Sequence, residues 1–347
     1  MIRRNIKRTI TYSWINSILL AILLFLMMWI LSGWNYWNGD YNAYHDYYVV
    51  RDTLSDWGLE VGYGGLNILA NELGLSFRDF QITLSAITLA LVFRFLVFFS
   101  ISPYLATLAY ALLLFPLDYV LLRNGLAFAI FLQGIISFIN ISSHGRLKFL
   151  LSIVLATSVH QSFMFFLILL IIPRERVIPL RVAISYLVLF YSLYIILRKG
   201  YVLPESLAEH LRFYSQSLKN AVILTVLNFF SVVGVFLMHL AICRGRLVLS
   251  IPRDRDSIFI MNLNVISLSL VVLYFESDVF VRLFRVLLFI NIAYCINVFC
   301  VGGNYKKLVC AFYILAFSFY ILYYFLIPVL EFTVIPLFKY NSLIGYF

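Results

Sequence analysis

Charged side chains are scarce in this chain of 347 residues, where Asp, Glu, Lys and Arg together make up 12%. Soluble domains carry about 25% charged residues. Hydrophobic residues make up 63% of the chain, more than two soluble domains of this total length could bury. This composition excludes a cytosolic enzyme, a disordered chain and a nucleic-acid-binding protein, despite the net charge of +10. The remaining class is a polytopic membrane protein, in which lipid covers the apolar surface.

Cysteine is also scarce, and none of the four cysteines lies in a polar loop expected on the far side of the membrane. We expect them to pack as apolar side chains, without disulfide or metal roles. The sequence lacks a serine nucleophile elbow, a Walker A motif, an HExxH motif and paired metal-ligand spacing. It therefore predicts neither a metal nor another cofactor.

Long apolar runs dominate the chain and predict an all-α fold of membrane helices. Two polar stretches, 33–79 and 198–220, are long for connections within a helix bundle and are expected to carry function. We expect a single polytopic domain over residues 1–347, with these two stretches as loops on the far side. The apolar runs cover approximately residues 13–32, 80–98, 103–121, 124–141, 147–172, 180–197, 221–242, 258–275, 279–299 and 308–328.

The run 147–172 decides the topology, because the polar residues 157–162 lie near its middle. A single crossing would place the arginine-rich segments that follow outside, against the positive-inside rule. Two short helices broken near His160 return them to the cytoplasm, and such a break is tolerated where it is buried in protein or lines a wet cavity. We therefore predict a broken helical hairpin near His160 and about 11 membrane segments. With the N-terminus inside, the net charge separates into +13 inside and −3 outside, which gives the +10 of the chain.

The first polar stretch places carboxylates among tyrosines, with Asp40, Tyr44 and Tyr48 followed by Glu60. Aromatic faces stack on sugars, while carboxylates accept hydroxyl hydrogen bonds and protons. The pattern suits a sugar-binding site. The alternative is an interfacial loop that carries an aromatic belt.

Arginines recur at the predicted outer ends of helices. Arg123 and Asn124 follow a tight turn, and Arg282 and Arg285 share one helix face because they are three residues apart. Each arginine alone could snorkel, or pair with nearby acids such as Glu276 and Asp278. Several arginines in one outward cavity would instead bind an anionic lipid headgroup such as a pyrophosphate.

His160 is an ionisable residue inside an apolar run, with Ser158, Gln161 and Ser162 beside it. An isolated histidine in such a run is usually a hydrogen-bonded structural group. Intramembrane ionisable residues are also candidates for function, so both interpretations stay open for His160.

These residues together resemble the EpsG/Wzy-like family of exopolysaccharide and O-antigen repeat-unit polymerases. The resemblance covers residues 36–300, and Asn124 departs from it because the family often has Gln after the arginine. It rests on five short motifs in the family's order: Asp40-x-x-x-Tyr44-x-x-x-Tyr48, Glu60-x-Gly62-Tyr63, Arg123-Asn124-Gly125-Leu126-Ala127, His160-Gln161-Ser162 and Arg282-Leu283.

The resemblance implies a glycosyltransferase-C-like enzyme of the bacterial inner membrane, multi-pass, with a cytoplasmic N-terminus and an active site facing the periplasm. It would polymerise undecaprenyl-pyrophosphate-linked oligosaccharide repeat units into O-antigen or exopolysaccharide. The two polar stretches would be periplasmic loops. No cofactor is required, because the leaving group is already good. The expected partners are the lipid-linked glycan, the bilayer and a chain-length regulator protein, with no nucleic acid.

The resemblance and the residue chemistry together predict the roles of ten residues. We expect Asp40 or Glu60 to be the catalytic base, with the choice between them open. His160 would orient a phosphate or the acceptor hydroxyl, or be the base itself. We expect the others to bind substrate: Arg51, Arg123, Asn124, Arg282, Arg285, Tyr44 and Tyr48. The alternatives in function are a flippase or transporter for the same lipid-linked sugar, and a ligase or acyltransferase of the cell envelope. A flippase would carry charges at midplane depth in two repeated halves, whereas here the charges gather on one face and no repeat is visible.

Overall fold

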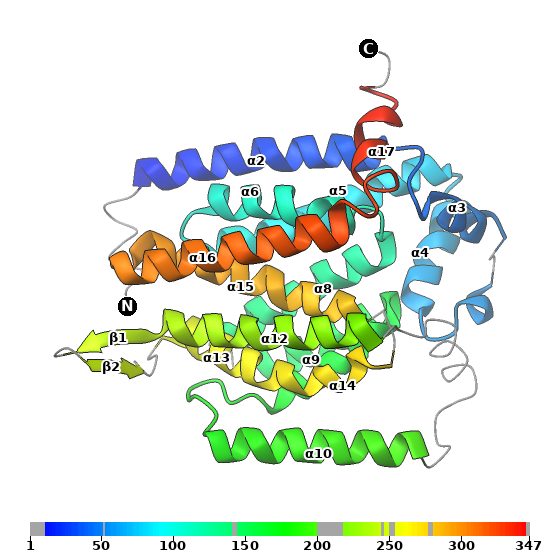
Figure 1. Ribbon diagram of the computed structural model, residues 1–347. Helices are drawn as coiled ribbons and strands as arrows, with labels where there is room; N and C mark the ends of the chain where they lie inside the picture. Colours follow the sequence, from blue (N-terminus) through cyan, green and yellow to red (C-terminus); the bar gives the residue numbers. More distant parts are fainter. Residues whose placement is uncertain are drawn as a thin grey trace. The chain divides into compact units, whose positions relative to one another are not determined.

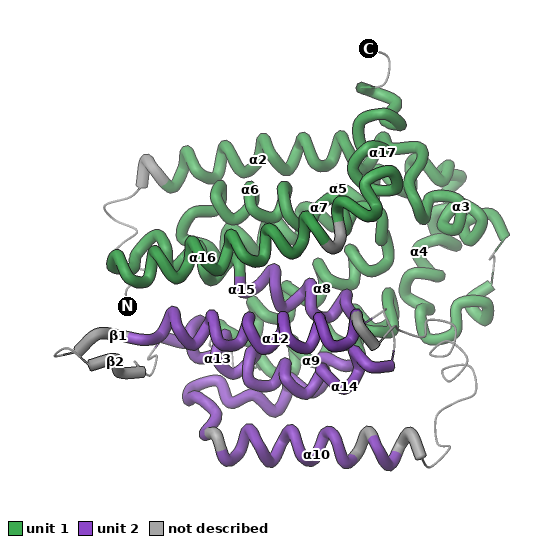
Figure 2. Tube along the Cα trace, in the orientation of Figure 1, with its two compact units in different colours: residues 1–164, 292–347 green, residues 165–291 purple. Residues whose placement is uncertain are grey.

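A computed structural model of the protein describes residues 11–50, 53–140, 144–199, 218–243, 246–249, 254–276 and 280–344. The chain forms two compact units, shown in Figure 2. The first comprises residues 1–164 and 292–347, and the second comprises residues 165–291. The chain passes between them inside η2 and again inside α15. The single domain expected over residues 1–347 stays a prediction.

The first unit is helical, and Figure 1 labels most of its elements. Within it, α8 packs against both α5 and α9, and α2 packs against α5 and α6. Its elements are α2 (Thr11–Gly33), α3 (Tyr41–Val50), η1 (Leu54–Trp57), α4 (Val61–Glu72), α5 (Phe77–Phe99), α6 (Pro103–Leu113), α7 (Phe115–Asp118), α8 (Leu122–Ile139), α9 (Gly145–Val159), the start of η2 (Gln161–Ile171), the end of α15 (Val281–Val301), α16 (Asn304–Tyr320), the π-helical turn η5 (Ile321–Leu326) and α17 (Val334–Lys339).

The second unit is also helical, except for a short antiparallel hairpin in which Leu240 pairs with Leu249 and Cys243 with Arg246. This hairpin ends the apolar run expected as a helix over 221–242, because α12 stops at Met238. The elements of this unit are the rest of η2, α10 (Leu180–Lys199), α12 (Leu218–Met238), β1 (Leu240–Cys243), β2 (Arg246–Leu249), α13 (Arg255–Ser267), η3 (Leu268–Leu270), α14 (Val271–Tyr274) and the start of α15.

The protein is a multi-pass membrane protein, with seven helices among the described residues that are long and apolar enough to cross a bilayer. Three further apolar helices are shorter: Pro103–Leu113, Gln161–Ile171 and Arg181–Ser192. The predicted helical membrane fold is thus confirmed, apart from the short β1–β2 hairpin, whereas the count of 11 crossings and the glycosyltransferase-C fold stay predictions. The seven long helices are Trp14–Gly33, Phe77–Phe99, Leu122–Ile139, Asn220–Met238, Arg255–Tyr274, Val281–Val301 and Asn304–Tyr323.

The apolar run at 103–121 was expected to be one helix, and the structure divides it. Helix α6 ends at Leu113, and α7 is a separate turn that contains Pro116. Proline lacks the N–H that a continuing helix needs, and its ring clashes with the preceding turn. The chain therefore breaks near Leu114, and α6 is too short to span by itself.

The break predicted near His160 is present. Helix α9 ends at Val159, His160 has an extended backbone with φ −149° and ψ 115°, and η2 begins at Gln161. The N–H of His160 still donates to the carbonyl of Ala156 at 2.8 Å, so the last helical bond of α9 is kept. The backbone therefore turns at the residue that carries the imidazole.

The polar stretch 33–79 is folded rather than a loop, since α3, η1 and α4 occupy most of it. The stretch 198–220 lies largely outside the described residues. Helix α2 is fixed to α5 beside the first stretch: Gln81 donates to the carbonyls of Ser32 and Asn35 at 2.8 and 2.7 Å. These bonds satisfy carbonyls near the C-terminal end of α2 that have no partner within the helix.

The C-terminal segment lies against the chain that leads into α3. Asn35 donates to the carbonyl of Pro336 at 2.7 Å, and the N–H of Gly39 donates to the carbonyl of Phe332 at 3.1 Å. Asn341 donates to the carbonyl of Ile30 at 2.9 Å. Residues 332–342, here called the C-terminal strap, therefore fix the position from which α3 starts (Figure 1).

Candidate active site

Glu60 lies immediately before α4, at its N-cap position. Its position depends on a close approach between α4 and α9, because a Cβ built on Gly62 would lie 2.9 Å from the carbonyl oxygen of Ser158 and closer still to its hydroxyl. Only glycine permits this approach at residue 62. The packing of α4 on α9 brings Glu60 to the end of α9, where His160 lies.

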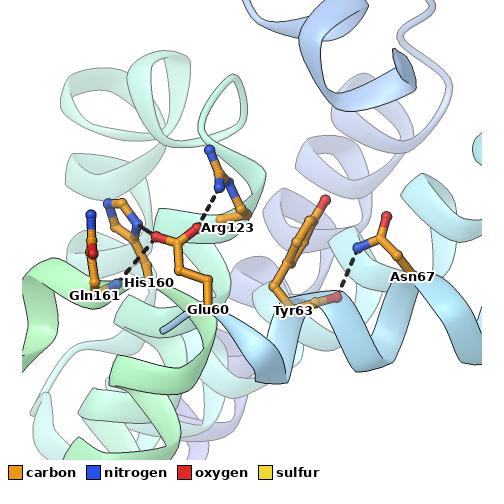
Figure 3. A network of polar contacts seen from close by, with 6 residues as sticks. All are labelled: Glu60, Tyr63, Asn67, Arg123, His160 and Gln161. Atoms are coloured by element: carbon orange, nitrogen blue, oxygen red, sulfur yellow. Dashed lines mark hydrogen bonds and ion pairs between the residues drawn. The ribbon is translucent and has the colours of Figure 1, made fainter. Parts of the chain in front are cut away.

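The carboxylate of Glu60 accepts hydrogen bonds from the break that follows α9. His160 Nδ1 lies 2.6 Å from Glu60 Oε1, and the backbone N–H of Gln161 donates to the same oxygen at 3.2 Å. The His160 and Glu60 side chains are 8% and 10% exposed. Figure 3 shows both groups converging on the carboxylate. The helix break thus supplies two donors to one oxygen.

Arg123 closes the other side of the carboxylate. It lies in the first turn of α8, and its Nη1 forms an ion pair with Glu60 Oε2. Three segments separated along the chain therefore meet at one carboxylate, from the start of α4, the start of α8 and the end of α9. We call Glu60, Arg123, His160 and Gln161 the Glu60 network (Figure 3).

The network keeps Glu60 ionised. Burial alone would raise its pKa, but the hydrogen bond from His160 and the charge of Arg123 outweigh burial and lower the pKa to about 2. The start of a helix also favours a negative charge, and Glu60 stands at the start of α4 close to the start of α8. At neutral pH the carboxylate is therefore an anion with both oxygens engaged.

Three tyrosine rings surround the guanidinium of Arg123. Its Cζ lies 5.5 Å from the ring centroids of Tyr44 and Tyr47 and 5.9 Å from that of Tyr63. Such contacts attract a cation through the ring quadrupole. Tyr47 and Tyr63 were not among the residues predicted for the site. Tyr47 could have been found because it is three residues from Tyr44 on the same helix, and Tyr63 because it lies one turn after Glu60.

Several buried polar atoms beside the network have no hydrogen-bond partner. Arg123 Nε is one, and Tyr63 Oη and Asn67 Oδ1 are two more on α4, on side chains that Figure 3 shows next to the network. Asn124 Oδ1 is another, on the residue after Arg123. Burial raises the pKa of Tyr63, so its hydroxyl stays protonated. Buried polar atoms are usually paired, so these groups leave bonding capacity for a bound molecule or water.

Asp40 and Tyr48 take up positions at the two ends of α3. The carbonyl of Asp40 accepts the N–H of Tyr44 at 3.1 Å, which starts the helix that carries the tyrosines. The hydroxyl of Tyr48 donates to the carbonyl of Leu75 at 2.8 Å, and its ring packs on Phe77 and Phe80. The structure thus gives Tyr48 a packing contact, and its predicted substrate role stays a prediction.

The remaining predicted arginines lie apart from these segments in the chain. Arg282 lies in the first turn of α15 and Arg285 follows it by three residues, both within the second unit, and Arg285 is buried. Arg51 and Asp278 lie outside the described residues. The structure therefore brings together Glu60, Arg123, His160 and Tyr44 within the first unit, and Asn124 follows Arg123 on α8.

The described residues contain no group of three or more His, Cys, Asp or Glu side chains arranged to hold a metal ion. A comparison with models of known families matches residues 18–342 to the EpsG family. No curated protein and no solved structure matches the chain.

Proposed function

The chain belongs to the EpsG family, a Wzy-like polymerase family, and we propose that it polymerises oligosaccharide repeat units carried on undecaprenyl pyrophosphate. The reaction would occur at the periplasmic face of the inner membrane and produce O-antigen or exopolysaccharide. Family membership supports a polymerase-type function broadly. The observation that carries the finer proposal is the Glu60 network, in which a carboxylate, an imidazole and a guanidinium meet.

The chemistry needs a cation beside the leaving pyrophosphate and a proton acceptor beside the attacking hydroxyl. Arg123 supplies a permanent cation, since guanidinium binds phosphate oxygens in a bidentate manner and keeps its proton. Its Nε, buried without a partner, is a donor available to a phosphate oxygen. Glu60 and His160 are the proton-accepting groups of the network, and Asp40 is a third candidate outside it.

The other predicted residues extend this proposal. Arg282 and Arg285 remain proposed contacts of the pyrophosphate, and Arg51 is proposed as a weaker one. Tyr44 would stack on a sugar ring, with Tyr48 as a further aromatic contact, and Asn124 would bind the sugar or phosphate through its amide. A chain-length regulator protein is the proposed protein partner.

No cofactor takes part in the proposed reaction. Undecaprenyl pyrophosphate is a good leaving group, so positioning of the two substrates and stabilisation of the developing negative charge supply most of the rate enhancement. In this proposal Arg123 stabilises the negative charge, and Glu60 and His160 are the groups that can accept the proton.

The test is a reaction of purified protein with lipid-linked repeat units in detergent or nanodiscs. The expected product is longer glycan on the lipid, resolved as a ladder on a gel. Movement of the lipid-linked sugar across a vesicle membrane without new glycosidic bonds would identify a flippase instead. Transfer of glycan to a different acceptor would identify a ligase, and acyl transfer would identify an acyltransferase; each of these results would refute the polymerase.

A further inference from the structure

The hydrogen bonds of Glu60 distinguish between the groups that could take the proton. Oε1 accepts from His160 Nδ1 and from the N–H of Gln161, and Oε2 is paired with Arg123. A carboxylate whose two oxygens already accept from three donors is a weak proton acceptor. Protonation of Glu60 would weaken its ion pair with Arg123, so proton transfer from a substrate hydroxyl to this carboxylate is disfavoured.

The same contacts also fix the position of one proton on the imidazole ring of His160. An ionised carboxylate only accepts hydrogen bonds, so the short contact with Glu60 Oε1 requires the proton on His160 Nδ1. In neutral histidine the other ring nitrogen then carries the lone pair. His160 is 6% exposed and its backbone is fixed by the end of α9, so the ring has one orientation.

We propose that His160, through Nε2, is the proton acceptor of the reaction, and that Glu60 is a positioning residue that holds the imidazole in the Nδ1-protonated form. This inference rests on the proposed function. It follows the same logic as a carboxylate that orients a catalytic histidine in a hydrolase, here with Glu60 also holding Arg123. The carboxylate of Glu60 therefore positions both the proposed base, His160, and the cation, Arg123.

In the proposed step, the oxygen of an acceptor hydroxyl forms a bond to the anomeric carbon of the donor sugar, and the bond from that carbon to the pyrophosphate oxygen breaks. The lipid pyrophosphate leaves with the electron pair, next to the guanidinium of Arg123. The hydroxyl proton passes to His160 Nε2, and the imidazolium that forms is stabilised by ionised Glu60. The proton is later released to water.

The first experiment compares rates of glycan extension for the wild type, His160→Ala, Glu60→Gln and Asp40→Asn. His160→Ala is expected to lower kcat by about 10²- to 10⁴-fold, the contribution of a general base, with a much smaller change in KM. Added imidazole is expected to restore activity to His160→Ala and to no other variant. His45→Gln is the matched control, since His45 lies on α3 with a half-exposed side chain and no part in the network.

The second experiment measures kcat against pH. The charged group that contacts the pair is Arg123 from α8, and the titratable groups around its guanidinium are Tyr63 from α4 and Tyr44 and Tyr47 from α3. Glu60→Gln is expected to keep measurable activity and to move the acid limb to lower pH by about one unit, because a neutral amide no longer favours the imidazolium. Loss of all activity in Glu60→Gln together with no imidazole rescue of His160→Ala would make Glu60 the base and overturn the proposal. Full loss in Asp40→Asn with an active His160→Ala would assign the base to Asp40 and also overturn it.

A third measurement does not depend on turnover. Nitrogen-15 NMR of histidine-labelled protein, with His160 assigned by comparison with His160→Gln, is expected to show the Nδ1-protonated neutral ring in the wild type. An Nε2-protonated ring would overturn the proposal. If the wild type forms no longer glycan while His160 shows the expected ring form, the proposed function fails and the Glu60–His160 arrangement stands as a structural pair.

Discussion

Two clusters of buried polar side chains lie between helices of this protein, one in each unit, and they differ in charge. The Glu60 network joins a carboxylate, a guanidinium and an imidazole. The cluster in the second unit is neutral. Its central members Asn264 and Asn291 exchange hydrogen bonds at 2.8 Å in both directions, and Asn291 also donates to Ser231 at 2.9 Å. We call these three residues, with Asn228 and Ser267, the amide cluster.

The two clusters also differ in how completely their atoms are paired. Ser267 donates to Asn228 Oδ1 at 3.1 Å, and Asn228 donates to the carbonyl of Ser267 at 3.1 Å. The polar side-chain atoms of the amide cluster are thus paired with one another, as expected of polar contacts that hold membrane helices together. Around the Glu60 network, Arg123 Nε and Asn124 Oδ1 lack partners. Among the described residues, the amide cluster thus uses its polar side-chain atoms for packing, whereas the surroundings of the Glu60 network keep polar atoms for the ligand that we propose.

The largest expected effect tests the charged cluster. Arg123→Ala removes the proposed pyrophosphate contact and leaves Glu60 buried without its cation. Loss of a group that stabilises transition-state charge costs about 10²- to 10³-fold in kcat, and the unpaired carboxylate lowers stability further. Turnover of purified protein and the length of the surface glycan ladder in a polymerase-deficient strain measure the result.

Arg123→Lys is the control, because it keeps the charge and loses the planar fork. Its activity is expected to lie between those of the wild type and Arg123→Ala. A normal ladder from an Arg123→Ala protein that is expressed at the wild-type level would refute the assigned role of this arginine.

The next effect tests the packing that creates the charged cluster. Gly62→Ala places a methyl group against Ser158 and pushes α4 away from α9, so Glu60 moves away from His160. Overpacking of this kind costs about 1–3 kcal/mol of stability, and we expect kcat to fall by about tenfold or more as the geometry is lost. Gly65→Ala is a matched control on the same helix, since no heavy atom lies within 4 Å of a Cβ built there. Equal behaviour of the two variants in turnover and thermal unfolding would contradict the close-approach argument.

A smaller effect concerns the dependence of stability on pH. The pKa of Glu60 is lowered to about 2 in the folded protein, compared with about 4.3 for an unperturbed Glu. A carboxyl group whose pKa is lower in the folded than in the unfolded state stabilises the folded state. This stabilisation is complete when the pH is above the pKa of the unfolded state, and it is lost as the pH falls through the pKa of the folded state. The difference in unfolding temperature between wild type and Glu60→Gln is therefore expected to shrink as pH falls from about 4 towards 2. A difference that already shrinks between pH 8 and pH 6 would show that another group is titrating.

The smallest effect is expected in the amide cluster. Asn291→Ala removes bonds to Asn264 and Ser231 and should cost about 1 kcal/mol, typical of hydrogen bonds between membrane helices. Turnover per folded molecule is expected to stay within twofold of the wild type. The double variant Asn264→Leu/Asn291→Leu should recover part of the loss, because no unpaired amide remains. A fall in turnover as large as that of Arg123→Ala would remove the distinction between the two clusters.

Much of this fold follows from the sequence because membrane helices have strong local signals. The apolar runs predicted most helices, and the polar residues around His160 predicted the break, since a polar group inside lipid needs a partner. The run 103–121 forms two helices rather than one, because Pro116 interrupts a segment whose hydropathy alone indicates a continuous helix. The helices within 33–79 do not follow from the hydropathy of the sequence, because this polar stretch lacks the long apolar run that marks a membrane helix.

The candidate site could be predicted only in its parts. The sequence supplied Glu60, Arg123 and His160 as separate candidates, but their meeting depends on the approach of α4 to α9, which requires Gly62. The glycines between 62 and 65 do not by themselves predict this close approach, because it depends on Ser158 of the neighbouring helix α9. Our choice of His160 rather than Glu60 as the base rests on the hydrogen bonds that both carboxylate oxygens accept. These bonds cannot be predicted from the spacing of the residues in the sequence.

The C-terminal strap has a consequence for how the protein is made. Asn35 bonds to Pro336, and Asn341 to the end of α2, across separations of 301 and 311 residues. A ribosome adding about 5–20 residues per second needs roughly 15–60 s to reach the strap after it has made α3. During that interval the chain that leads into α3, the helix that carries Tyr44 and Tyr47, lacks its hydrogen bonds to the C-terminal strap. The tyrosines around Arg123 are therefore expected to reach their final positions only after the strap has been made, late in translation.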